Sequence, residues 1–416
     1  MRIFRGGAVI LMAAVATPCV LLLNHLYAGT QGDLRLTLEA LAAIFGVCAA
    51  LGIGYTLCAS VLVKRFFANP VKPGAICPPV TIIKPLHGAE WNLVEHLSSF
   101  ADQNYDGEFE LVFGVHDADD PAVQAVQELR AHYPHIPVTV VADDRLYGPN
   151  RKVANLVNMV AYARHEILCF ADSDVRVERD YLRNVVGALH EPDVGLVTSA
   201  YRGLAAPGLW PRFAAASTNY HFLPGVITGL AIGLARPCFG QTIAMHRSTL
   251  ALIGGLDQFA SHLAEDFEIG EAVRRTGLKV VVPAFTVQHA CVERTFRELF
   301  VHELRWSRTI RAAAPAGHLG SVFTHPLPFA LLAMLTSGCA IWSIELATLS
   351  WLSRALLTTR TGRALRADTG ALAFLLFSDL LQFAVFLASF CSSQVTWRGH
   401  RFRVNNAGML SSTPEG

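Results

Sequence analysis

Long apolar runs at the two ends of the chain constrain its fold most strongly. Residues 8–28 and 38–63 are each long enough to cross a hydrocarbon core, which takes roughly 20 helical residues. Four basic residues flank this pair of runs: Arg2, Arg5, Lys64 and Arg65. Because Lys and Arg are enriched in cytoplasmic flanks, residues 1–66 are predicted to form two transmembrane helices with both outer ends in the cytoplasm. A cleaved signal peptide is the alternative for the first run.

Two further apolar runs lie near the C-terminus, at residues 326–352 and 371–391. The first run fits either one long tilted helix or a tight hairpin. Residues 321–396 are therefore predicted to hold two or three transmembrane helices, which gives four or five spans for the chain. Arginines lie both between and after these runs, so charge does not decide the number. Residues 397–416 form a basic tail.

Residues 70–320 have the composition of a globular domain that is large enough to bury a full core. The whole chain is 52% hydrophobic and only 16% charged, as expected when part of it lies in lipid. Its formal net charge of +1 lacks the basic excess that neutralises nucleic-acid phosphates, so no nucleic-acid partner is expected. The nine cysteines form no CxxC pair, which predicts neither a zinc site nor a disulfide framework.

Short apolar runs of strand length alternate with helical patterns within this middle region. The runs lie at residues 80–86, 109–115, 136–142 and 166–172, and they are rich in β-branched side chains. Such alternation predicts an α/β domain with a mostly parallel sheet and helices on its faces. Ligands of such domains bind beyond the carboxyl ends of the strands.

Two acidic clusters follow predicted strands. Asp117, Asp119 and Asp120 follow the second strand, and Asp172 and Asp174 follow the fourth. Clustered carboxylates repel one another less when they share a divalent cation. The Asp-Ser-Asp stretch can offer two oxygens to Mg²⁺ or Mn²⁺, whose remaining positions suit diphosphate oxygens. Turn formation alone is the alternative, since Asp is common in turns.

Two predicted helix starts carry further candidate residues. Asn150 and Lys152 lie in GPNRKVANL, where a cation and free backbone N–H groups suit a phosphate, with a solvated helix end as the alternative. Asp266 lies in LAEDFEIGEAV, where it either stabilises the helix N-terminus or accepts the proton of an attacking hydroxyl. The spacing alone does not decide between these two roles.

The stretch HELRW ahead of the C-terminal apolar runs predicts a helix with two functional faces. Helical spacing puts His302, Arg305 and Trp306 in a sector about 100° wide, and Phe296 and Phe300 on another side. The arginine suits a diphosphate, and the tryptophan offers a flat apolar wall to a sugar or lipid. An amphipathic helix at the membrane interface is the alternative.

Residues 222–235 are uncharged but too short to span a membrane. Their proline and glycines, Pro224, Gly225, Gly229 and Gly233, are expected to interrupt a regular helix. Aromatic and basic side chains flank this run, which favours an interfacial segment at about residues 210–238. A buried core segment is the alternative.

The order of these motifs resembles the ceramide-glucosyltransferase-like family of inverting glycosyltransferases. The matching stretches are KPLHG, HDADDPA, ADSDVRV, AEDFEIGEAV, RW and the terminal WRGHRFRV. Within that family the chain looks most similar to bacterial hopanoid-biosynthesis-associated members, through GPNRKVANL, NYHFLPGV, LARPCFGQT and HELRWSRTI. The resemblance implies a cytoplasmic GT-A-type nucleotide-sugar-binding domain, anchored by N- and C-terminal transmembrane helices in the bacterial inner membrane.

The resemblance also implies roles for single residues. Asp266 is implied to be the catalytic base, with Arg305 and Trp306 as the closing pair of a Q/R-x-x-R-W motif. Asp172 and Asp174 are implied to hold the Mg²⁺ or Mn²⁺ ion. Nucleotide-sugar binding is implied for Lys84, Asp117, Asp119, Asp120, Asn150, Lys152, Asp172, Gln241 and His302. The histidine stands where the family has Gln or Arg, so its contact stays open.

The implied reaction moves a sugar from a UDP-sugar to the hydroxyl of a membrane lipid. The hopanoid-associated members imply N-acetylglucosamine and a polyol-tailed hopanoid, whereas the wider family implies glucose and ceramide. A processive polysaccharide synthase is an alternative enzyme. An inactive lipid-binding membrane scaffold is the alternative that is not an enzyme.

Overall fold

The computed structural model describes residues 31–71, 76–367, 372, 374–391, 394–397, 400–404 and 410–412. The transmembrane helix predicted at residues 8–28 lies outside them. The chain divides into two compact units. We call Met1–Lys64 with His302–Cys391 the helical unit, and Arg65–Val301 with Ser392–Gly416 the sheet unit.

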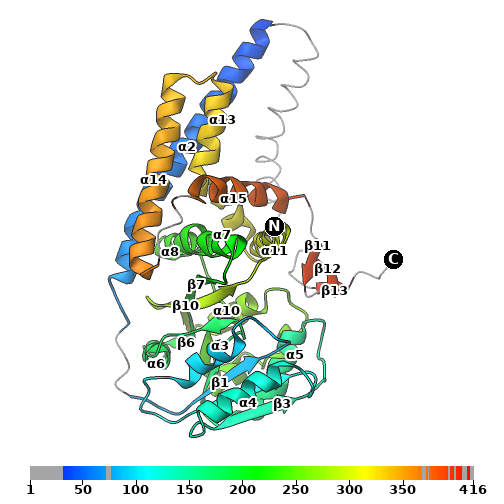
Figure 1. The fold of residues 1–416 in the computed structure, drawn as a ribbon. Helices are drawn as coiled ribbons and strands as arrows, with labels where there is room; N and C mark the ends of the chain where they lie inside the picture. Colours follow the sequence, from blue (N-terminus) through cyan, green and yellow to red (C-terminus); the bar gives the residue numbers. More distant parts are fainter. Residues whose placement is uncertain are drawn as a thin grey trace. The chain divides into compact units, whose positions relative to one another are not determined.

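A mixed seven-stranded sheet forms the centre of the sheet unit, in the order β3-β2-β1-β4-β8-β6-β9. Figure 1 labels β1, β3 and β6 of this sheet. Its strands are β1 (Val80–Pro85), β2 (Phe109–Val115), β3 (Val138–Ala142), β4 (Ile167–Phe170), β6 (Val194–Thr198), β8 (Ile243–His246) and β9 (Lys279–Val281). Strands β1 to β4 pair in parallel, whereas β8 runs antiparallel to both β4 and β6. The predicted α/β domain with a mostly parallel sheet is confirmed.

Two smaller sheets belong to the same unit. In the first, β10 (Thr286–Cys291) pairs with β5 (Val175–Arg176) and β7 (Ala200–Ala205). In the second, β11 (Gln394–Trp397), β12 (His400–Val404) and β13 (Leu410–Ser412) form an antiparallel sheet within the predicted basic tail and just before it. Helices connect the strands: α3 (Leu93–Ala101), α4 (Ala122–His132), α5 (Arg151–Val160), α6 (Tyr181–Leu189), α9 (Arg247–Leu252), η2 (Asp257–Phe259) and α10 (Glu265–Arg275).

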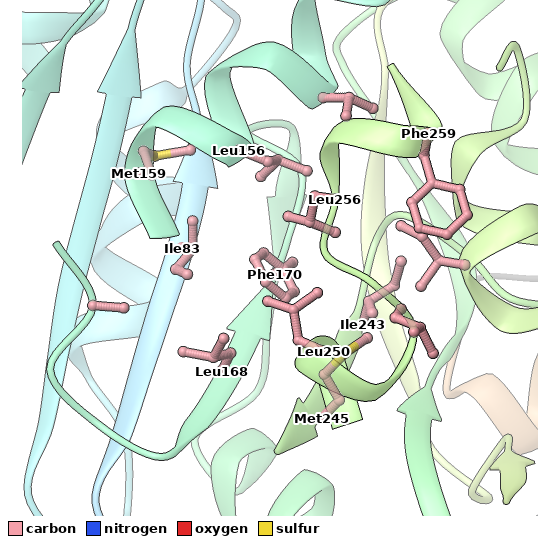
Figure 2. Close-up of a cluster of buried hydrophobic side chains, with 14 of the residues drawn as sticks. Ile83, Leu156, Met159, Leu168, Phe170, Ile243, Met245, Leu250, Leu256 and Phe259 are labelled. Carbon is pink, nitrogen blue, oxygen red and sulfur yellow. The ribbon is translucent and has the colours of Figure 1, made fainter. Parts of the chain in front are cut away.

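Helix α5 lies against β1 and β2, and its apolar face joins a core cluster (Figure 2). Leu156 and Met159 of α5 meet Phe170 of β4 and Ile243 of β8 there. Burial of each such side chain contributes about 1.5–3 kcal/mol relative to leaving it exposed. The cluster therefore fixes the segments that lead into the loops after β4 and before β8.

The predicted interfacial segment contains one helical stretch with a π-helical turn. It comprises α7 (Leu209–Ser217), the π-helix η1 (Thr218–Phe222) and α8 (Leu223–Ala231). The expected interruption was wrong for Gly225 and Gly229, which lie inside α8, whereas Pro224 lies in its first turn. The π-helical turn lies directly ahead of the proline, whose missing N–H cannot donate to the preceding turn. Gly233, with φ of 70°, does follow the end of the helix.

The helical unit contains the N-terminal and C-terminal apolar helices. Its elements are α12 (Pro315–Gly320), η3 (Ser321–Thr324), α13 (Pro326–Thr336), α14 (Ile341–Leu365) and α15 (Leu375–Ser389), together with most of α2 (Gln31–Phe67) and of α11 (Phe296–Ala313). Among the described residues, one helix, Asp33–Phe67, is long and apolar enough to cross a membrane. A second is added if Pro315–Thr324 and Pro326–Thr336, bent by 58°, count as one span.

The apolar run at residues 326–352 forms the hairpin rather than one long helix, with α13 and α14 side by side (Figure 1). Gly338 and Cys339, with φ of 63° and 59°, lie in the turn between them. Helix α15 has 15 residues, fewer than a helix needs to cross a membrane, so a span at residues 371–391 stays a prediction.

Candidate active site

Lys84 lies beneath the carboxyl edge of the parallel strands. Its ammonium donates a hydrogen bond of 2.6 Å to the backbone oxygen of Asp172 and lies 3.6 Å from the centroid of the Phe100 ring. The side chain is fully buried. Burial lowers the pKa of Lys84 to about 7, although Asp172 and Asp174 act in the opposite direction. The lysine therefore fixes the loop that carries the acidic pair.

Lys152 joins two carboxylates from distant parts of the chain. Its Nζ lies 2.6 Å from Oδ1 of Asp172 and 2.9 Å from Oε1 of Glu265. Burial lowers the pKa of Lys152, but attraction to Asp172, Glu265 and Asp266 outweighs burial and raises it above its ordinary value. The lysine is therefore ionised at neutral pH and links the end of β4 to the start of α10.

Asn150 connects the start of α5 with the start of α10 through hydrogen bonds. As the N-cap of α5, its Oδ1 accepts a hydrogen bond of 3.2 Å from the backbone N–H of Val153. Its Nδ2 donates to the backbone oxygen of His262 at 3.0 Å and to Oε2 of Glu265 at 3.1 Å. Because Asn150 is fully buried, these bonds fix Lys152 and Glu265 relative to each other.

The carboxylate of Asp266 is held by two backbone N–H groups. Gly240 donates to Oδ2 at 2.9 Å, and Phe267 donates to Oδ1 at 2.8 Å. Burial and the charge of Glu265 raise the pKa of Asp266 to about 7, against the opposing charge of Lys152. A carboxylate whose pKa lies near neutral pH suits a general base.

The loop at Gly240 passes close to this network. A Cβ atom at this glycine would lie 2.6 Å from Nζ of Lys152 and 3.2 Å from Oδ2 of Asp172. Gln241 follows as a half-buried residue. A small hollow of about 10 Å³ is lined by the glycine, Lys152, Asp172, Glu265 and apolar side chains. It has room for about one water molecule.

Asp174 faces a second, smaller group of polar side chains. Its Oδ2 lies 3.4 Å from Nδ1 of His289, and its Oδ1 is buried without a hydrogen-bond partner among the described residues. Burial raises the pKa of Asp174, but the His289 imidazole and Lys84 outweigh burial and lower it below the ordinary range. An ionised carboxylate with an unpaired oxygen fits a cation site.

No group of three or more His, Cys, Asp or Glu side chains in the described part of the chain is arranged to hold a metal ion. Asp172 and Asp174 supply two carboxylates, and a divalent ion takes about six oxygen ligands. The remaining ligands would come from substrate and water. The residues present therefore fit an ion that binds together with a diphosphate.

The acidic cluster after β2 is held separately. Oδ1 of Asp120 accepts hydrogen bonds of 2.8 Å from the backbone N–H groups of Gly88 and Ala122, and Oδ2 lies 3.3 Å from Nδ1 of His87. Asp117 and Asp119 are exposed, and the N–H of the second donates to Oδ1 of the first at 3.0 Å. That bond agrees with the turn-forming alternative for these two residues.

The HELRW residues lie on α11, within the helical unit. The rings of His302 and Trp306 lie 4.7 Å apart at 82°, so these two residues share one face as predicted. Arg305 lies on the same helix, and its backbone oxygen accepts a hydrogen bond of 2.9 Å from the Thr309 hydroxyl. At the start of α11, Phe296 packs against Trp210 of α7 at 5.6 Å.

The sequence analysis assigns no role to four side chains or backbone positions that the structure places at the site, His87, Gly240, Glu265 and His289. Glu265 stands beside Asp266 in AEDFE, and that neighbourhood is the one local signal for it. His289 lies inside an ordinary strand pattern, which gives no such signal. Only the three-dimensional structure brings it beside Asp174.

The network of Lys152, Asp172 and Glu265 lies at the carboxyl ends of the parallel strands, where α/β proteins of this class bind their ligands. The family model described as glycosyl transferase family 21 matches residues 44–410. The chain belongs to glycosyl transferase family 21, and the predicted ceramide-glucosyltransferase-like membership is confirmed.

Named relatives are similar at low identity. Ceramide glucosyltransferase 1 of Caenorhabditis elegans is 23% identical over 359 residues, which cover 83% of this chain and 76% of that protein. The ceramide glucosyltransferase of Candida albicans is 34% identical over 122 residues, 27% of this chain and 22% of that protein. A mannosyltransferase of Pyrobaculum calidifontis, solved with GDP-Man and Mn²⁺, has 22% identity and a TM-score of 0.47, covering 85% of this chain and 99% of its own.

Proposed function

We propose that this protein is a membrane-bound inverting glycosyltransferase of the GT-A type, which moves a sugar from a UDP-sugar to a lipid hydroxyl. The observation that carries the proposal is the network around Lys152 and Gly240. Lys152 bonds to Asp172, and Gly240 bonds to Asp266, so a charge suited to a diphosphate and a carboxylate suited to a base lie in one site.

In the proposed reaction, Asp266 removes the proton of the lipid hydroxyl. The hydroxyl oxygen attacks the anomeric carbon, the bond from that carbon to the diphosphate breaks, and the configuration inverts. Lys152 stabilises the negative charge that develops on the diphosphate. We keep the roles that the family resemblance implies for the remaining residues. Arg305 and Trp306 are the closing pair of the Q/R-x-x-R-W motif, and nucleotide-sugar binding is proposed for Asp120, Gln241 and His302.

A Mg²⁺ or Mn²⁺ ion is proposed to bind with the donor at Asp172 and Asp174, where it supplies charge stabilisation to the leaving diphosphate. The unpaired buried oxygen of Asp174, named above, supports this assignment. The chain's own residues orient the diphosphate and hold the proton at Asp266.

For the sugar and the lipid we propose N-acetylglucosamine and a polyol-tailed hopanoid, on the four stretches that resemble hopanoid-associated members. Glucose and ceramide are the second candidate pair, which the names of the curated relatives favour. An identity of 23% leaves room for a different acceptor within one family.

We propose that the protein lies in the bacterial inner membrane as a multi-pass protein, with the sheet unit in the cytoplasm. The apolar helix Asp33–Phe67 supports membrane attachment. The helical segment 209–231 is the proposed interfacial element for the lipid acceptor.

The test is transfer by the full-length protein in membranes, with each UDP-sugar offered to each lipid and the products identified by mass spectrometry. We expect an N-acetylglucosaminyl hopanoid, and no product from the Asp266→Asn variant. A glucosylated ceramide alone would replace the first pair with the second. A growing polysaccharide would support a processive synthase, and cellular function retained by Asp266→Asn would support a scaffold.

A further inference from the structure

The ammonium of Lys152 occupies the position of a cation between two carboxylates. It contacts Oδ1 of Asp172 and Oε1 of Glu265 at 2.6 and 2.9 Å, and its side chain is 18% exposed. One positive charge thus lies between two negative charges. Asp172 is also one of the two carboxylates proposed to hold the divalent ion, so the lysine and the ion share a ligand.

The surroundings of Lys152 hold its ammonium in this position. The residue lies in the first turn of α5, which Asn150 caps and Leu156 anchors in the core. On another side, the backbone of Gly240 comes so close that an added Cβ would lie 2.6 Å from Nζ. The contact with both carboxylates is therefore built into the packing and is not a chance surface pair.

An ammonium has three N–H donors, and two carboxylates leave one for a further acceptor. The diphosphate of a donor would be such an acceptor, because its oxygens are negatively charged and an ammonium N–H donates strongly to them. A divalent ion that approaches Asp172 without a diphosphate meets this ammonium and is repelled by it.

Resting on the function proposed above, we propose that Lys152 is a positioning residue that acts as a built-in cation for Asp172 and Glu265 before the donor binds. It opposes binding of a divalent ion alone and favours binding of the ion together with the diphosphate. The lysine keeps its contact with Glu265 and turns its remaining donor to the diphosphate.

The test measures Mn²⁺ binding to the purified full-length protein by electron paramagnetic resonance, with and without UDP. In the Lys152→Met variant, Mn²⁺ without UDP is expected to bind about tenfold more tightly than in the wild type, because a positive charge a few ångströms away is gone. The gain in Mn²⁺ affinity caused by UDP is expected to shrink. Unchanged or weaker Mn²⁺ binding without UDP overturns the proposal.

Two controls separate charge from structure. Lys152→Arg keeps the charge and is expected to keep the Mn²⁺ affinity of the wild type. Lys279→Met removes another lysine, which pairs with Asp193 at 3.3 Å on the surface, and is expected to leave Mn²⁺ binding unchanged. A tenfold gain in either control would contradict the proposed role.

If Lys152→Met does not fold, Glu265→Gln gives a second test. Loss of this carboxylate leaves the lysine to Asp172 alone and removes a nearby negative charge, so Mn²⁺ without UDP is expected to bind about fivefold more weakly. An unchanged affinity would overturn the proposal. Neither measurement uses a sugar or a lipid, so failure of glycosyl transfer would count against the proposed function and not against this inference.

Discussion

The backbone N–H of Gly240 lies 2.9 Å from Oδ2 of Asp266 and donates a hydrogen bond to it. The same glycine also packs against Lys152 and Asp172. A single backbone position therefore touches both the proposed base and the proposed diphosphate site, and a change there should affect both.

Gly240→Ala is expected to lower kcat/KM for the UDP-sugar by about a hundredfold, because displacement of a reacting group by about 1 Å has that effect. The new Cβ would lie 2.6 Å from Nζ of Lys152, so the ammonium must move. The fold should persist, since a flexible side-chain end can yield. Steady-state kinetics and a thermal unfolding curve measure the two quantities.

Gly320→Ala is the matched control, because a Cβ there meets no atom of the described chain within 4 Å. It should keep the kinetic constants of the wild type. Full activity in Gly240→Ala would show that the close approach of this loop does not matter.

The raised pKa of Asp266 predicts a pH dependence of transfer. Its carboxylate must be ionised to accept a proton, so kcat/KM is expected to fall about tenfold per pH unit below pH 7. Asp266→Asn should lower the rate by about 10²–10⁴-fold and remove the fall of kcat/KM below pH 7. A pH profile of the wild type that is flat between pH 5 and 7 would argue against Asp266 as the base.

The same pKa shift makes a prediction for stability. Between the ordinary carboxyl pKa and about 7, the folded protein holds a proton at Asp266 that the unfolded chain releases. The contribution of this group to the free energy of unfolding is therefore present at low pH and lost as the pH rises through 7. Unfolding of the wild type and Asp266→Asn across that range measures the difference, and parallel curves would contradict it.

Arg354 of α14 and Asp379 of α15 form a buried bidentate ion pair, with Nη2 to Oδ1 at 2.7 Å and Nε to Oδ2 at 2.8 Å. Both side chains are 3% exposed. Arg354→Met alone is expected to lower the free energy of unfolding by about 3–5 kcal/mol, because a buried charge is left unpaired. Arg354→Met with Asp379→Leu should recover most of that loss.

Denaturation of the purified full-length protein measures these effects. Arg35→Ala, which breaks the exposed pair with Glu39, is the control and should leave the unfolding curve unchanged. An Arg354→Met variant as stable as the wild type would mean that Asp379 finds water or another partner.

His302 and Arg305 are expected to respond differently to substitution. A glutamine can replace a neutral imidazole as a hydrogen-bond donor, so His302→Gln should keep measurable transfer. Arg305→Ala should abolish it, because a required positive charge is lost. Equal losses in transfer assays of the two variants would show that the histidine has a role of its own.

The sequence predicts the sheet because its local signals agree with the fold. The apolar runs that become β1 to β4 are bounded by turn residues and separated by helical patterns, and each strand end lies within two residues of its predicted place. The same pattern predicts that the acidic clusters lie at the ends of β2 and β4. Spacing along the chain is enough for these features, because neighbouring residues determine them.

The network around Lys152 could not be predicted from the spacing of residues along the chain. Lys152 and Glu265 lie far apart in the sequence, and their contact depends on how α5 and α10 pack. The full burial of Lys84 is equally invisible in KPLHG, where a lysine near a strand end suggests an exposed phosphate ligand. Such contacts arise from tertiary packing, which no local pattern records.

The π-helical turn at Thr218–Phe222 sets the rotation of α8 about its axis. An α-helix advances about 100° per residue, so deletion of one residue from this turn would rotate every later side chain of α8 by that angle. Leu223 and Ile227, which are buried, would turn out of the core, and side chains from another face of α8 would turn into it. The number of residues in this turn therefore determines which side chains of α8 are buried, and one residue more or fewer would change them.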